Sequence, residues 1–457
     1  MQRMSNELTR PGTLDEAVRD AMTRWSVPGI AVGILRDGAV ETHGYGVASL
    51  ETGFPVRPDT LFQIGSISKV YTATLAMQLV EEGKLSLDTP VIEYLPDLKL
   101  ADADAQRTIT MRHLLTHTSG LEGDRFDDYG NGDDALAKAI AEFHTLRQWT
   151  APGELWTYCN SGFYLAGRVI EQILGQTFEQ AMRERVFQPL GMEHSFFFAY
   201  EAIVYPVAVG HTQVAPGSAE HKVARLYPLP RVVNAAGGII ANVADLLRFA
   251  AFHMSDGTVG GKQVLTAESI AAMQEQQVKA GNFAEAYGIG WSLHTVDGVK
   301  VVSHGGSTNG FQAQLALVPS RRFAIAILTN ADRGAAAHRD IQRWALEHEL
   351  GLRHADPEPI TLPAEVLERV TGTYKRPHST ITLSVDEGRL KAEIQMSSPL
   401  TGETETLPPL YMSPISEQEF IITEGEYRGM RTDVILGDNG KPRFLRFSGR
   451  LAEYVQD

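Results

Sequence analysis

Two hydrophobic patterns, far apart in the chain, predict a single β-sheet. A continuous apolar run at 30–35, the tight turn Arg36-Asp37-Gly38 and an alternating stretch at 40–45 are typical of an antiparallel hairpin. The same strand pattern returns far downstream, at 291–294, 299–303, 311–318 and 323–328. We expect five strands from these two regions to form one antiparallel sheet.

Helical sequence fills most of the span between these strands. A glycine follows two of the helical runs, as a left-handed C-terminal residue would, and Asn242-x-x-Asp245 predicts a helix start. The predicted helices cover 70–82, 135–144, 161–174, 178–186 and 244–253, with a last helix at 339–350. This order predicts an α/β domain whose sheet is flanked by helices, with an inserted helical lobe and a cleft between sheet and lobe.

The sequence changes character after the last predicted helix. Residues 354–360 have the composition of a linker, and short β runs punctuated by turn residues follow from Gly372 onward. Their spacing suits a small antiparallel barrel or sandwich. We therefore predict an α/β domain at 1–353, a linker at 354–360 and an all-β domain at 361–457.

Composition and charge narrow the partners of the chain. Its 457 residues favour two units, and 43% hydrophobic with 21% charged residues is typical of a globular protein. A net charge of −15 argues against binding nucleic acid or an anionic membrane, because both require a positive field. One cysteine and an N-terminus, residues 1–15, without an apolar signal segment favour a cytoplasmic location. Whether the chain forms a homo-oligomer is left open.

The first candidate for chemistry is the motif Ser66-Ile67-Ser68-Lys69. It follows an apolar segment and opens a predicted helix, which places the Ser66 hydroxyl and the Lys69 amine on one helical face. A serine needs a base within hydrogen-bond reach, and a lysine can serve when desolvation lowers its pKa. The backbone N–H of Ser66, at a helix start, can also bind an oxyanion.

A second motif, Tyr158-Cys159-Asn160, precedes the helix predicted at 161–174. The Tyr158 phenol can relay a proton between Ser66, Lys69 and a leaving group, and Asn160 can hold Lys69 and donate to a substrate amide. Asn160 also suits a helix cap. Cys159 is read as a packed free cysteine rather than a nucleophile.

The third motif is His304-Gly305-Gly306, at the end of a β run that would face the cleft. Glycines at that edge allow a substrate backbone to approach closely. The backbone N–H of Ser307 could then complete an oxyanion hole with that of Ser66.

The three motifs in this order resemble the penicillin-binding-protein and class C β-lactamase-like serine hydrolase family. Further phrases carry the resemblance: LLTHTSGL at 114–121, AGGI at 236–239 and YGIGW at 287–291. The resemblance implies that Ser66 is acylated, that Lys69 and Tyr158 are base and proton relay, and that Asn160, His304, Gly305, Gly306 and Ser307 contact substrate. Which of Lys69 and Tyr158 takes the first proton stays open.

His304 departs from the pattern of true β-lactamases, which carry a lysine or arginine at this position. A histidine with a reference pKa of about 6.5 is mostly neutral at pH 7 and is a weaker partner for a carboxylate. The His-x-Gly form of the third motif is similar to that of the D-aminopeptidase and D-amino-acid amidase branch and its related esterases. Members of that branch often carry a C-terminal lipocalin-like barrel. We expect hydrolysis of small esters or of D-amino-acid-containing peptides or amides. The alternatives are a β-lactamase or D-Ala-D-Ala carboxypeptidase, and a non-catalytic sensor.

Other patterns point away from metals and cofactors. The five aspartates within 124–134 lack the spacing of a calcium loop and are interpreted as a solvated surface loop, and His348 and His354 do not make H-E-x-x-H. No G-x-S-x-G surrounds Ser66, which excludes the usual α/β-hydrolase arrangement. We expect no metal, no cofactor, and a small-molecule or short-peptide substrate.

Overall fold

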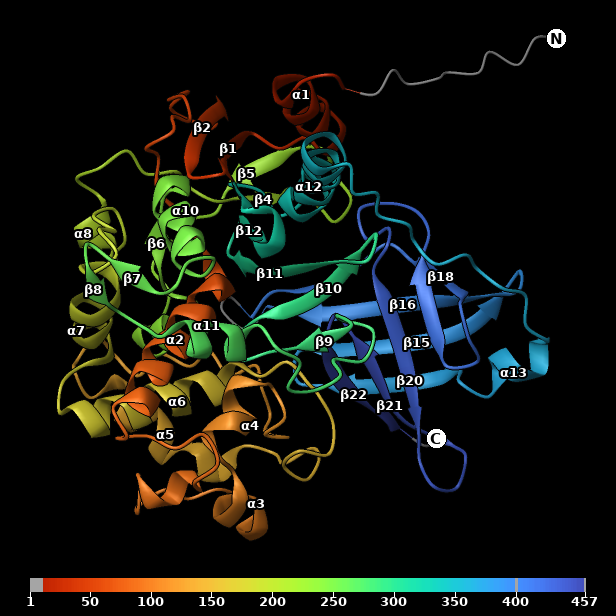
Figure 1. The fold of residues 1–457 in the computed structure, drawn as a ribbon. Helices are drawn as coiled ribbons and strands as arrows, with labels where there is room; N and C mark the ends of the chain where they lie inside the picture. Colours follow the sequence, from red (N-terminus) through yellow and green to blue (C-terminus); the bar gives the residue numbers. More distant parts are fainter. Residues whose placement is uncertain (1–10, 399–401, 456–457) are drawn as a thin grey trace.

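The computed structural model describes residues 11–398 and 402–455 and is built around one antiparallel sheet. Its strand order is β2-β1-β13-β12-β11-β10-β9, so the N-terminal hairpin pairs with the last strand of the downstream group (Figure 1). The strands are β1 (Gly29–Arg36), β2 (Ala39–Gly46), β9 (Ala286–Tyr287), β10 (Ser292–Val296), β11 (Val299–Thr308), β12 (Phe311–Val318) and β13 (Phe323–Thr329).

The predicted antiparallel sheet and helical lobe are confirmed, but the sheet has seven strands rather than five. The six apolar segments noted in the sequence, one more than the five strands expected, all join it, and β9 adds a seventh strand of two residues, too short to show a period of its own. Strand β13, which lies between β1 and β12, is buried along its whole length. A strand covered on both faces reads as a continuous apolar run, which is how it appears in the sequence.

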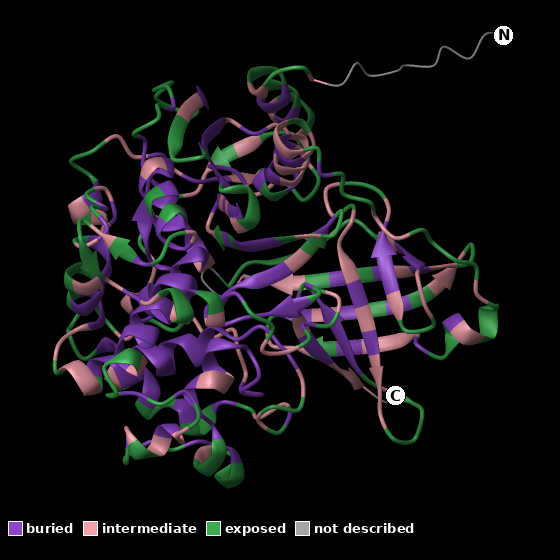
Figure 2. Ribbon diagram, viewed as in Figure 1, coloured by how far each residue is buried: buried purple, intermediate pink, exposed green. Residues whose placement is uncertain are grey.

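Helices cover both faces of this sheet. One face carries α1 (Leu14–Trp25) and α12 (Gly334–Leu350), which share a hydrophobic core with β1 and β13. The other face meets the helical lobe through a larger core, seen in Figure 2 as a dense group of buried residues. The lobe contains α2 (Ser68–Glu81), α3 (Ala103–Thr108), α4 (Met111–Leu115), α5 (Ala135–Ala141), α6 (Asn160–Leu174), α7 (Phe178–Met182), α8 (Ala199–Ala202), α9 (Asn234–Gly237), α10 (Val243–Phe252) and α11 (Ala267–Met273).

Helix ends follow the local chemistry of the chain. The Asn242 side chain accepts from the Asp245 N–H and starts α10, as the sequence predicts. Helix α6 starts differently: its cap is Cys159, whose Sγ accepts from the Gly162 N–H, and Asn160 is the first helical residue. Asn160 is therefore not the cap, and its side chain is free for another partner.

The C-terminal strands close into a barrel of eight strands around its own core. The order runs β15-β14-β22-β21-β20-β19-β18-β16, and β16 pairs back to β15, with β17 added at the edge of β16. After α13 (Ala364–Glu368), its strands are β14 (Gly372–Arg376), β15 (Ser379–Asp386), β16 (Arg389–Ser397), β17 (Thr404–Thr406), β18 (Leu410–Pro414), β19 (Glu419–Ile422), β20 (Arg431–Leu436), β21 (Pro442–Phe447) and β22 (Arg450–Val455). The predicted all-β barrel is confirmed, and Figure 1 shows it beside the sheet and the lobe.

None of the helices within the described residues is both long and apolar enough to cross a membrane. The prediction that residues 1–15 contain no apolar signal segment falls mostly on residues 1–10, which lie outside the described part of the chain.

Candidate active site

Ser66 lies in a short 3₁₀ turn, Gly65–Ile67, that leads into α2. The Ser68 hydroxyl holds the turn, since it donates to the Gly65 carbonyl at 2.7 Å and accepts from the Ile239 N–H at 3.1 Å. Gly65 has a φ of 52°, in the left-handed region that favours glycine. The nucleophile candidate is thus presented on a turn that its neighbours fix.

Lys69 is completely buried one turn further along the helix. Its Nζ lies 3.2 Å from Ser66 Oγ, 2.7 Å from Asn160 Oδ1 and 2.7 Å from the Ala236 carbonyl oxygen. Burial lowers the pKa of Lys69 well below its ordinary value, and the Arg450 cation lowers it further, while Asp124 opposes both. This environment favours the neutral amine, which is the form that can accept a proton.

Tyr158 sits between the side chains of Lys69 and Arg450. Lys69 Nζ and Arg450 Cζ each lie 4.9 Å from the centroid of its ring, and the His117 ring packs against it at 4.2 Å. Burial raises the pKa of the Tyr158 phenol above its ordinary value, and a hydrogen bond to Ser66 partly offsets this. The phenol therefore stays protonated at neutral pH. Tyr158 lies in the segment without regular secondary structure that precedes α6, and it is buried, 7% exposed.

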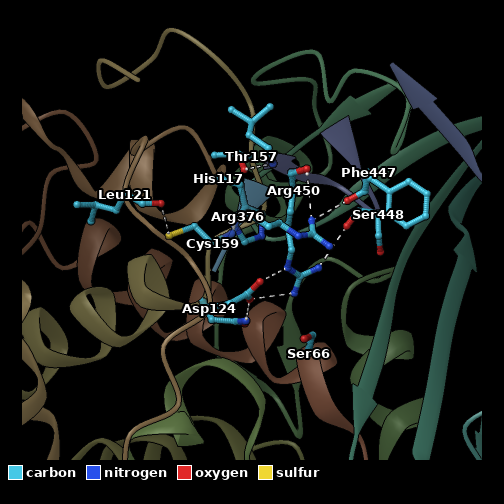
Figure 3. A network of polar contacts seen from close by, with 12 residues as sticks. Ser66, His117, Leu121, Asp124, Thr157, Cys159, Arg376, Phe447, Ser448 and Arg450 are labelled. Carbon is cyan, nitrogen blue, oxygen red and sulfur yellow. Dashed lines mark hydrogen bonds and ion pairs between the residues drawn. The ribbon is translucent and has the colours of Figure 1, made fainter. Parts of the chain in front are cut away.

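Asn160 connects Lys69 to a charged pair that the motifs do not contain. Its Nδ2 donates to Asp124 Oδ1 at 2.9 Å, and Arg450 pairs with both oxygens of Asp124 (Figure 3). Arg450 begins β22 of the barrel. The interpretation of 124–134 as a solvated loop is wrong for Asp124, whose side chain is 22% exposed and ion-paired.

The third motif lies on β11, beyond the point where β10 stops pairing with it. His304 is 4% exposed, its Nε2 lies 3.1 Å from the Tyr287 hydroxyl, and its Nδ1 lies 2.6 Å from the Gly305 carbonyl oxygen. Burial lowers the pKa of His304 to about 3, so the ring is neutral, as expected from the sequence. Arg450, from the barrel, is a cation that lines the same cavity as His304.

The glycines of this motif allow the strand to approach the Ser66 turn. A methyl group on Gly306 would lie 1.9 Å from the Ile64 carbonyl oxygen, and one on Gly65 would lie 2.7 Å from the Ser307 nitrogen. The sequence predicted that these glycines let a substrate backbone come close. In the structure they also let β11 come close to the turn that carries Ser66. This approach brings the amides of Ser66 and Ser307 into the same corner of the site.

These residues line one cavity of about 790 Å³. Every predicted site residue except Lys69 contributes to its wall, together with two residues of the barrel hairpin, Ser448 and Arg450. Lys69 lies behind the wall and reaches Ser66 from within the protein. The structure therefore brings all eight predicted residues together.

Cys159 is buried, and burial raises the pKa of its thiol to about 11. Its Sγ donates to the Leu121 carbonyl at 3.5 Å, so it behaves as a packed free cysteine. A histidine does lie close to it: His117 Nδ1 accepts from the Cys159 backbone N–H at 3.0 Å. Across residues 11–398 and 402–455, no three histidine, cysteine, aspartate or glutamate side chains are placed to hold a metal ion.

A mixed α/β fold of this topology, with these motifs at the junction of sheet and lobe, defines a β-lactamase-like protein. The family model described as "Beta-lactamase" matches residues 14–349, so the chain belongs to the β-lactamase family, whose members are serine hydrolases. The family predicted from the three motifs is confirmed.

Similarity extends to proteins that share most of the chain. Penicillin-binding protein 4 from Amycolatopsis lactamdurans is 36% identical over 364 residues, which cover 78% of this chain and 94% of that protein. The crystal structure of SurE with D-Leu covers 97% of this chain and 98% of its own, with a TM-score of 0.74 and 26% identity. The octameric penicillin-binding protein homologue from Pyrococcus abyssi covers 96% and 98%, with a TM-score of 0.66 and 27% identity.

Proposed function

We propose that the protein is a serine hydrolase that cleaves ester or amide bonds through an acyl-enzyme on Ser66. The observation that carries this proposal is the contact of 3.2 Å between Lys69 Nζ and Ser66 Oγ, with a lysine whose burial favours the neutral amine. Without such a partner, a serine hydroxyl is a poor nucleophile at neutral pH.

The three neighbours of Lys69 Nζ favour lysine as the first base. A neutral amine has two N–H donors and one lone pair. The Asn160 Oδ1 and Ala236 carbonyl oxygens can only accept, so they take both N–H groups. The lone pair then points to the Ser66 hydroxyl, which donates its proton to Nζ as Oγ attacks the substrate carbonyl carbon.

Tyr158 suits the second proton transfer. Its protonated phenol lies beside Lys69 and Ser66, and can pass a proton to the leaving alcohol or amine while receiving one from Lys69. The N–H groups of Ser66 and Ser307 would stabilise the oxyanion of the tetrahedral intermediate. Attack of water on the acyl-enzyme, by the reverse proton path, releases the acid and restores Ser66.

We propose small esters and D-amino-acid-containing peptides or amides as the substrate class. A neutral His304 offers no permanent cation to the carboxylate of a penicillin, and the similar SurE structure holds D-Leu. One panel tests this: p-nitrophenyl esters, D- and L-aminoacyl p-nitroanilides and a chromogenic cephalosporin, each with the unmodified protein and Ser66→Ala. Turnover of esters or D-aminoacyl anilides that is lost in Ser66→Ala is expected. Preferential cephalosporin hydrolysis would favour the β-lactamase alternative, and acylation without turnover would favour the sensor.

Two expectations from the sequence stay predictions. The Pyrococcus abyssi homologue is octameric, and light scattering on this chain would show whether it self-associates as well. The cytoplasmic location is tested by fractionating cells that produce the protein.

A further inference from the structure

The tip of one barrel hairpin is docked into the candidate active site. The tip joins β21 to β22 through Ser448 and Gly449, both in the left-handed region, with φ values of 51° and 75°. The Gly449 carbonyl accepts from the Tyr158 N–H at 2.8 Å, and the Leu451 N–H donates to Thr157 Oγ1 at 3.2 Å. The hairpin is therefore bonded to the same segment that presents the Tyr158 motif.

This docking places Arg450 at the end of a chain of polar contacts that reaches Lys69. Arg450 Nη2 lies 3.1 Å from Asp124 Oδ1, the same oxygen accepts from Asn160 Nδ2 at 2.9 Å, and Asn160 Oδ1 accepts from Lys69 Nζ at 2.7 Å. Figure 3 shows the Arg450–Asp124 pair above Ser66. Every step joins a donor to an acceptor.

The Arg450–Asp124 pair, at the end of this series of contacts, determines which way the Asn160 amide is oriented. An amide has a donor end and an acceptor end, whereas an ionised carboxylate can only accept. Although burial opposes its ionisation, Arg450 lowers the pKa of Asp124 below its usual range. The NH₂ group of Asn160 must then face Asp124, which leaves its oxygen facing Lys69.

The same pair determines the net charge around Lys69. Asp124 and Arg450 are charged, and Arg376, held by the Phe447 carbonyl, is a second cation beside Asp124. The other titratable groups that face Lys69 are neutral at pH 7 because of burial: the rings of His117 and His304, the Cys159 thiol and the Tyr158 phenol. Loss of Arg450 alone would leave the Asp124 anion less compensated and favour a protonated Lys69.

We propose that Arg450 is a positioning residue for catalysis, through which the C-terminal barrel completes the active site of the α/β domain. Paired with Asp124, it orients the Asn160 amide that holds Lys69 and offsets the carboxylate that would otherwise retain the lysine proton. The role rests on the proposed function, in which Lys69 is the base. Arg450 acts on Lys69 through Asp124 and Asn160, and its guanidinium also lies 4.9 Å from the centroid of the Tyr158 ring.

The test is the pH dependence of fluorophosphonate labelling at Ser66, measured on the full chain from pH 4 to 10. The variants are Arg450→Gln, Arg450→Lys, Asp124→Asn and the double variant Arg450→Gln/Asp124→Asn. Labelling needs the neutral lysine, so a higher lysine pKa moves the acid limb of the profile to higher pH. The limb should rise by about one pH unit in Arg450→Gln, as expected for a unit charge nearby at an effective dielectric constant of about 20.

The acid limb should move in opposite directions in Arg450→Gln and Asp124→Asn, which a purely structural role of Arg450 would not produce. Asp124→Asn should move the limb to lower pH, the double variant should return it close to the original, and Arg450→Lys should keep it there because the cation is retained. Glu453→Gln is the matched control: it removes an ion pair with Arg147 between the same two domains, 2.7 Å long, and should leave the profile unchanged.

Three results would overturn the proposal. If the acid limb of the labelling profile stays at the same pH in Arg450→Gln and in Asp124→Asn, then Arg450 has no electrostatic effect on Lys69. A change confined to the KM of carboxylate-bearing substrates would make Arg450 a substrate clamp instead. Absence of Ser66 labelling in the unmodified protein at every pH would overturn the proposed function itself, together with this inference.

Discussion

Lys69 and Asn160, 91 residues apart in the chain, meet through a hydrogen bond of 2.7 Å at the starts of two helices. Lys69 lies in the first turn of α2 and Asn160 is the first residue of α6, so the contact joins the first two motifs directly. It fills one donor of the amine, the Ala236 carbonyl fills another, and Ser66 Oγ is the remaining neighbour. The packing of two helix starts thus prepares the lysine as a base.

Removal of either proton-transfer group should abolish most of the turnover. Lys69→Ala and Tyr158→Phe should each lower kcat by about 10² to 10⁴, the range that general acid–base catalysis contributes. Thermal melts should barely move. The measurement is steady-state kinetics on the best ester or anilide of the panel.

Tyr164→Phe provides the control for the phenol. Tyr164 lies in α6, one turn after Asn160, and its hydroxyl is buried without a hydrogen-bond partner among the described residues. Loss of the Tyr164 hydroxyl in Tyr164→Phe should leave kcat nearly unchanged. Near-normal turnover by Tyr158→Phe on both an ester and an amide would refute the proton relay.

A permanent cation at the third motif should shift substrate preference. His304→Lys should raise acylation by a β-lactam and reduce hydrolysis of neutral esters, because a desolvated contact with a carboxylate is worth about 1.5 to 3 kcal/mol. The ratio of the two activities should change tenfold or more. His304→Gln, which stays neutral, should not produce this change. An unchanged ratio in His304→Lys, or efficient cephalosporin hydrolysis by the unmodified protein, would contradict the role of His304.

The docked hairpin tip should tolerate no side chain at Gly449. A methyl group there would lie 2.9 Å from Phe283 Cδ2 and 3.3 Å from the Trp156 ring, in addition to the penalty of about 1 to 2 kcal/mol for a left-handed alanine. Gly440→Ala carries the same backbone penalty, with a φ of 71° and no atom within 4 Å. Gly449→Ala should therefore lose far more turnover than Gly440→Ala at similar thermal stability. Equal losses would show that the hairpin need not dock.

Buried neutral histidines should make the fold sensitive to acid. Burial lowers the pKa of His253 to about 3, whereas an unfolded histidine has a pKa of about 6.5. Between these values the unfolded state binds the proton and the folded state does not, so the free energy of unfolding falls as pH drops through this window. One such histidine lowers the free energy of unfolding by about 2 kcal/mol between pH 7.5 and pH 5.

Urea titrations at the two pH values check this through His253→Gln. The variant should reduce the difference between the two free energies of unfolding by about 2 kcal/mol, whatever it does to stability at pH 7.5. An unchanged difference would mean that His253 does not titrate between the folded and unfolded states.

The sequence predicted what short-range patterns encode. Ser66 and Lys69 share a helical face because of their spacing, and the flanks of Tyr158 and His304 identify the elements that carry them. The burial of β13 also follows from its continuous apolar run. All eight predicted site residues therefore came together, although their roles stay predictions.

The contribution of the barrel could not be predicted from the sequence. Arg450 and Asp124 are 326 residues apart, and each looks ordinary in its local sequence: one follows a turn, the other opens an acidic run. Only the docking of the β21–β22 hairpin brings them together, and docking depends on the shapes of two folded domains. The seventh strand was missed for a simpler reason, since two residues carry no periodicity.

Intact-mass spectrometry after treatment with a fluorophosphonate tests whether Ser66 is the nucleophile. Ser66 Oγ lies 3.2 Å from Lys69 Nζ, and Ser66 lines the cavity. The unmodified protein should gain the mass of one adduct, peptide mapping should place it on Ser66, and Ser66→Ala should gain none. An adduct that persists in Ser66→Ala, or that maps to Cys159, would contradict the assignment of Ser66 as the nucleophile.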